Sequence, residues 1–199
     1  MRQATRITAA TLGMAAGFAG LEHGYFEILQ GNVLPPGLVI ASMGPPCDPE
    51  VVWNACEPAM TILPNLLFSG ILTGLISLAV LVWSAVFIQR RHGGMVLILL
   101  SIALLLFGGG FFPPIIGITG GAAGMQINRP LTGKPANITL QAARLWPWPL
   151  VVLITWLLVQ FPLGYFYNDF LKGIMVFGLL LIVTLLPLSV YTAYAHDCS

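Results

Sequence analysis

Long apolar runs alternate with short polar or glycine- and proline-rich segments along most of this chain. The runs cover about residues 7–29, 66–89, 95–118, 146–166 and 170–195. Each approaches the roughly 20 residues that an α-helix needs to cross a bilayer. We therefore predict an all-α integral membrane protein, a single polytopic domain built as a bundle of about five transmembrane helices.

The third run is interrupted by Gly108–Gly110 and by Pro113–Pro114. Glycine is flexible, and proline removes a backbone donor and clashes with the preceding turn, so a regular helix does not continue here. Broken backbone at membrane depth persists only where protein or a water-filled cavity satisfies it. We interpret 95–118 as one broken span; the alternative is a helix that ends in a glycine-rich loop.

Composition supports the membrane class and limits the partners. Hydrophobic residues make up 57% of the 199 residues and charged residues 8%, whereas an average soluble domain has roughly 25% charged residues. The net charge is +1 without a dense basic cluster, so we expect no nucleic-acid partner. The expected partners are the lipid bilayer and either further copies of the chain or another membrane subunit, because so small a bundle needs help to enclose a path.

The distribution of basic residues predicts an orientation in a plasma or inner membrane. If five spans alternate across the membrane, five basic residues lie on one side and three on the other. The group of five consists of Arg2, Arg6, Arg90, Arg91 and Lys172. Positively charged loops stay in the cytoplasm. We therefore expect a cytoplasmic N-terminus, an outside C-terminus, and two long outer loops at about 31–64 and 119–145. The first run also fits a cleavable signal peptide, because Arg2 and Arg6 precede a short apolar core.

Three ionisable residues, Glu22, His23 and Glu27, lie in the first predicted helix. A charge at mid-membrane costs about 2.5–3.5 kcal/mol on insertion scales, so such residues are candidates for function. We predict a proton, ion or ligand site, in which the imidazole could exchange protons near neutral pH. The alternatives are a structural hydrogen bond to another helix for Glu22 and His23, and a solvated position at the interface for Glu27.

Glycines and hydroxyls line the faces on which we expect helices to pack. Gly13, Gly17, Gly20 and Gly24 share one face of the first helix and match the small-xxx-small pattern of close packing. Ser69, Thr73 and Ser77 form a stripe on the second helix, for which we also favour packing over a pore lining.

The cysteines predict a disulfide rather than a metal site. Cys47 and Cys56 share the first outer loop, where an oxidising exterior favours their pairing; pairing with Cys198 is the alternative. A metal site made by these cysteines and His196 matches no standard zinc spacing. The sequence contains no phosphate-loop, dinucleotide-binding or zinc-protease motif, so we expect no cofactor and no metal.

Three functions remain open. The first is a transport or permeation component that uses the ionisable site on the first helix. The second is a non-catalytic accessory, sensory or complex-stabilising subunit. The third, a membrane-embedded enzyme acting on lipid, is disfavoured because no second cluster of catalytic side chains accompanies Glu22 and His23.

Overall fold

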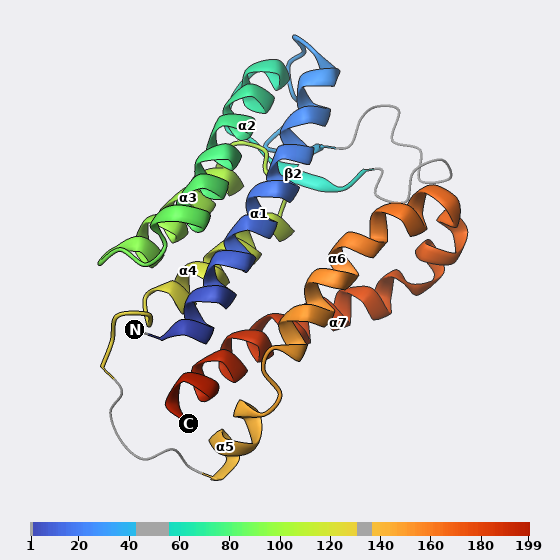
Figure 1. The fold of residues 1–199 in the computed structure, drawn as a ribbon. Helices are drawn as coiled ribbons and strands as arrows, with labels where there is room; N and C mark the ends of the chain where they lie inside the picture. The colour runs from blue at the N-terminus through green and yellow to red at the C-terminus, as the bar shows by residue number, and fades with distance from the viewer. Residues whose placement is uncertain (1, 43–55, 131–136) are drawn as a thin grey trace.

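A computed structural model describes residues 2–42, 56–130 and 137–199, and it is mostly helical (Figure 1). The elements in chain order are α1 (Gln3–Gln30), β1 (Val39–Ala41), β2 (Pro58–Met60), α2 (Leu66–Val82), the π-helical turn η1 (Trp83–Phe87), α3 (Gly93–Leu106), α4 (Phe112–Gly124), α5 (Asn137–Ala143), α6 (Trp148–Phe166) and α7 (Asn168–Cys198). β1 and β2 form a small antiparallel pair in which Ile40 faces Ala59.

Among the described residues, three helices are long and apolar enough to cross a membrane. They are the continuous α2–η1 helix Leu66–Phe87, α6 and α7. α1 has 28 residues but is less apolar, and α3 and α4 have 14 and 13 residues, or about 20 Å each at 1.5 Å per residue. The all-α membrane class is therefore supported, whereas the five-span bundle is not confirmed.

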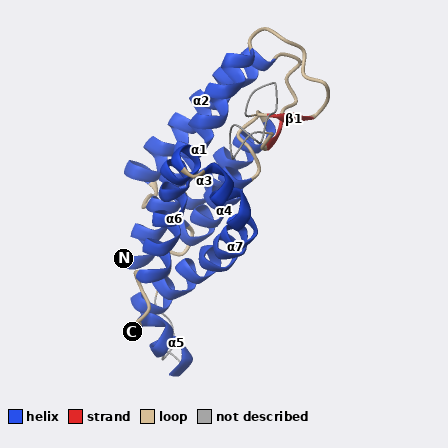
Figure 2. Cartoon of the chain, turned by 90° about the vertical axis from the view of Figure 1, so that its right-hand side faces the viewer, coloured by secondary structure: helices blue, strands red, loops and turns tan. Residues whose placement is uncertain are grey.

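The helices run antiparallel between two ends of the molecule, which we name the terminal end and the loop end. At the terminal end, Arg2 bonds to Ile127 and Asn128 bonds to Gln89. At the loop end, the amide of Leu66 bonds to Val33. Figure 2 shows both chain termini and α5 at one end and β1 at the other.

The two termini meet at the terminal end, an arrangement that does not fit the prediction that they lie on opposite sides of a membrane. The Asp197 carboxylate accepts hydrogen bonds from the amides of Ala4 and Thr5 at 2.9 and 2.7 Å, and from the Thr5 hydroxyl at 2.7 Å. Arg2, at the N-cap, supplies no side-chain cap of its own. A carboxylate from the end of α7 therefore satisfies the free amides at the start of α1.

The third apolar run folds as a helical hairpin, not as one broken span. Gly94 at the start of α3 packs against Gly121 and Gly124 near the end of α4, and Ser101 packs against Gly117. The chain reverses between the helices, where Gly108 and Gly110 have φ of +108° and +72°, values that glycine adopts without a steric penalty. The reversal returns residues 119–130 to the terminal end, so the predicted outer loop 119–145 does not lie beside 31–64.

α1 is the central helix, and its glycines lie against α2, η1 and α3. A β-carbon on Gly17 would lie 2.7 Å from Leu81 Cγ, and one on Gly24 would lie 2.9 Å from the Gly70 carbonyl oxygen. Gly13 and Gly20 face Ser84 and Ser77 in the same way. The absence of side chains on this face thus lets the helix backbones approach closely.

The α6–α7 hairpin packs on the other helices mainly through the C-terminal half of α7. That half is buried at Leu186, Ser189, Thr192 and Ala193, whereas Tyr165, Phe166 and Phe177 near the hairpin turn are 71–83% exposed. Figure 1 shows the hairpin diverging from α1 toward the loop end. A cavity lies in the resulting wedge.

Candidate functional site

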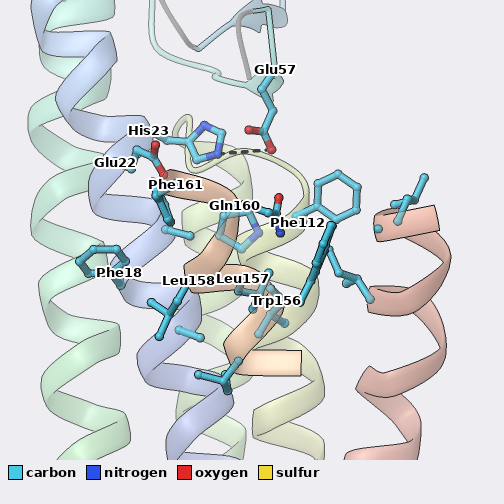
Figure 3. A pocket seen from close by; sticks show the side chains of 18 of the residues that line it. Phe18, Glu22, His23, Glu57, Phe112, Trp156, Leu157, Leu158, Gln160 and Phe161 are labelled. Atoms are coloured by element: carbon cyan, nitrogen blue, oxygen red, sulfur yellow. Dashed lines mark ion pairs between the residues drawn. The ribbon is translucent and has the colours of Figure 1, made fainter. Parts of the chain in front are cut away.

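A cavity of about 660 Å³ lies between α1, α4, α6 and α7. Its walls are mostly apolar and include four aromatic rings, Phe18, Phe112, Trp156 and Phe161. Figure 3 shows these rings below a polar end, where His23 and Glu57 face each other and Glu22 lies beside them. Size and lining fit a small-molecule site, which is usually apolar with a few convergent polar groups.

The polar end combines residues from α1 with the segment before β2. His23 Nε2 lies 3.8 Å from Glu57 Oε1, and the two side chains are 3% and 24% exposed. Gly110 passes directly over the imidazole: a β-carbon there would lie 2.5 Å from His23 Cε1. The α3–α4 reversal therefore covers the ring and holds it toward Glu57.

The hydrogen bonds around His23 define its tautomer. The Ser42 hydroxyl donates to the Glu57 carbonyl oxygen at 2.9 Å and lies 2.6 Å from His23 Nδ1. With its only proton given to the carbonyl, Ser42 accepts from Nδ1–H, which leaves Nε2 of the neutral ring as an acceptor. A proton between His23 and Glu57 can thus reside on the carboxyl and point at Nε2.

The pKa of Glu57 is raised from its ordinary value near 4.5 to about 7. Burial is the larger cause, and the neighbouring negative charge of Glu22 is the second. Near neutral pH, Glu57 is therefore close to half protonated. The polar end of the cavity can gain or lose a proton over the physiological range.

Ser42, His23 and Glu57 include the residue types of a serine hydrolase, but their arrangement does not suit one. Ser42 is fully buried and is absent from the cavity lining. Its hydroxyl proton is held by a carbonyl oxygen rather than by the imidazole, which is the reverse of an activated nucleophile. Ser42 positions the histidine instead.

The predicted ionisable residues divide into two groups. Glu22 and His23 line the cavity, whereas Glu27 lies outside its lining, against Gly70 of α2 and Gly108. Glu27 is 0% exposed, so the alternative of a solvated interfacial carboxylate is wrong. The reason is tertiary: the α3–α4 reversal covers a position that helix length alone placed near water.

Sequence reasoning missed two polar residues of the cavity, Glu57 and Gln160. Gln160 is a single amide inside an apolar run, which was a usable signal because an amide is costly in a bilayer. Glu57 gave no such signal, because a loop carboxylate is ordinarily solvated.

The described residues include two of the three cysteines and the histidine of the alternative metal site. Cys47 lies outside the described residues, so the Cys47–Cys56 disulfide stays a prediction, and Cys198 is a free thiol. Cys56 borders the cavity, whereas His196 stacks on Trp146 at the terminal end, so these residues do not form one site. Within the described ranges, no group of three or more His, Cys, Asp or Glu side chains is placed to hold a metal ion.

No known protein family, curated protein or solved structure matches the chain.

Proposed function

We propose that this chain is a small membrane transport component that binds an amphiphilic cation in the cavity between α1, α4, α6 and α7. The observation that carries the proposal is the pairing of two carboxylates, Glu22 and Glu57, with aromatic walls in one cavity. A carboxylate in low dielectric favours a cation as its partner, and aromatic rings attract cations while burying apolar groups.

Proton exchange couples this site to pH. The pKa of Glu57, raised to about 7 by burial and by Glu22, means that an arriving cation displaces a proton. The His23 ring is held by Ser42 through Nδ1, so its Nε2 faces the Glu57 carboxyl. Proton-linked binding of this kind would let a pH gradient drive transport, which favours a transport component over an accessory subunit.

The charge distribution supports a cytoplasmic terminal end. The described basic residues at that end are Arg2, Arg6, Arg90, Arg91, Arg129 and Arg144, while Lys172 lies near the α6–α7 turn, paired with Asp169 at 3.2 Å. The acidic residues of the cavity lie toward the loop end. Under the positive-inside rule, both termini are in the cytoplasm and the cavity's polar end is toward the outside.

Binding of radiolabelled tetraphenylphosphonium to the protein in nanodiscs tests the proposal, with empty nanodiscs as the blank. If the cation needs ionised Glu57, affinity rises about tenfold from pH 6 to pH 8, following the ionised fraction. Glu22→Gln and Glu57→Gln each lower affinity, and Glu57→Gln also removes the pH dependence. Asp169→Asn, a carboxylate outside the cavity, is the matched control and keeps both.

Uptake of ethidium into proteoliposomes under an imposed pH gradient then separates transport from binding alone. Gradient-dependent uptake that Glu57→Gln abolishes supports transport. Binding without uptake supports an accessory or sensory role, and the absence of specific binding at either pH contradicts the proposed substrate class.

A further inference from the structure

A second polar cluster lies one turn of α1 beyond His23, around the carboxylate of Glu27. Glu27 is 0% exposed, and neither of its carboxyl oxygens has a hydrogen-bond partner. The Ser69 hydroxyl of α2 is close enough to interact with this carboxylate, and a β-carbon on Gly108 would be 2.5 Å from its Cδ. An ionised carboxylate without a donor or counter-ion is strongly unfavourable away from water.

The hydroxyls around Glu27 have already given their protons elsewhere. Ser69 donates to the Phe107 carbonyl oxygen at 2.8 Å, and Thr73 donates to the same oxygen. Thr61 lies 2.7 Å from the Ser69 hydroxyl, to which it can donate. The Ser69 and Thr73 hydroxyl oxygens thus keep lone pairs, and in this arrangement both hydroxyls direct their protons to the Phe107 carbonyl oxygen.

The backbone at this point is the end of a helix. Phe107 is the C-cap of α3, and the chain beyond it is unwound through Gly108, with φ of +108°. Carbonyl oxygens at the C-terminal ends of interrupted helices carry partial negative charge. In transporters, such carbonyls coordinate sodium ions or protons.

We propose that the Glu27 carboxylate and the hydroxyl oxygens of Ser69 and Thr73, beside the end of α3, form a binding site for a monovalent metal cation, with sodium as the expected ion. The set contains one negative charge and otherwise neutral oxygens, which matches a singly charged hard cation better than a divalent ion, whose sites use more carboxylates. None of these three side chains lines the cavity, and the site does not depend on the proposed cation substrate. Its ion supplies the counter-charge that Glu27 lacks.

Thermal unfolding of the detergent-solubilised full chain tests the site, with sodium chloride compared against choline chloride at equal ionic strength. At sodium concentrations about a hundredfold above Kd, Tm rises by roughly 5 °C or more. Glu27→Gln removes the sodium-dependent rise, whereas Glu22→Gln, the carboxylate in the cavity, retains it.

Thr73→Val keeps the shape of the side chain and removes one oxygen, so it provides a second test if Glu27→Gln does not fold. We expect it to shift the sodium midpoint to higher concentration by about tenfold, the loss of roughly one favourable interaction with a charged group. Equal Tm of the wild type in sodium and choline overturns the site, and so does a sodium effect that survives Glu27→Gln. Stabilisation by acid alone, without a sodium effect, shows instead that Glu27 holds a proton.

Discussion

The raised pKa of Glu57 makes the stability of the fold depend on pH. The pKa of this carboxyl rises from about 4.5 to about 7 because the carboxyl is buried and because the negative charge of Glu22 is nearby. The folded state consequently binds more protons than the unfolded state between these two pH values, and stability falls as pH rises through the window.

We therefore expect Glu57→Gln to gain stability relative to the wild type as pH rises from about 4.5 to about 7. The relative gain in the free energy of unfolding is small below pH 4.5, increases between pH 4.5 and 7, and reaches a plateau above pH 7. The plateau is about 3 kcal/mol, the free-energy equivalent of the pKa shift. Tm measured across this range for both proteins checks the prediction, with Asp169→Asn as the control. A constant Tm difference between wild type and Glu57→Gln at all pH values contradicts it.

Close packing of α1 on α2 is the main feature at the scale of elements. Gly24 lies against two backbone atoms of α2, and a β-carbon there would be 2.9 Å from both the Gly70 carbonyl oxygen and the Gly74 nitrogen. Backbone atoms cannot move aside as a flexible side chain can. The two helices must separate to admit even one methyl group.

We expect Gly24→Ala to destabilise the fold by about 1–3 kcal/mol, the usual cost of overpacking, or several degrees in Tm. Gly74→Ala is the matched control, because nothing lies within 4 Å of a β-carbon at that position. There the exchange is neutral or stabilising, since alanine favours helix. Equal Tm for the two variants would show that α1 and α2 do not pack as described.

At the scale of the whole molecule, the six long helices of the described chain, α1, α2–η1, α3, α4, α6 and α7, alternate in direction, so both termini lie at the same end. The hydrogen bonds between Asp197 and the start of α1 and the gathering of arginines at the same end support the proposed cytoplasmic position of both termini. We expect a reporter that is active only in the cytoplasm to be active at either terminus, and inactive when inserted after Gly37 in the loop at the opposite end. Opposite signals from the two termini contradict this topology.

The sequence alone determined the membrane class, because apolar runs near bilayer length and 8% charged residues have few other solutions. It also located Glu22 and His23, since ionisable residues in an apolar helix are conspicuous. Only the tertiary structure decided that 95–118 is a hairpin, that Glu27 is buried and that Glu57 joins His23. Those features depend on where glycines allow the chain to reverse and on which side chains the packed helices then bury. The local pattern of residues determines neither the reversals nor the burial.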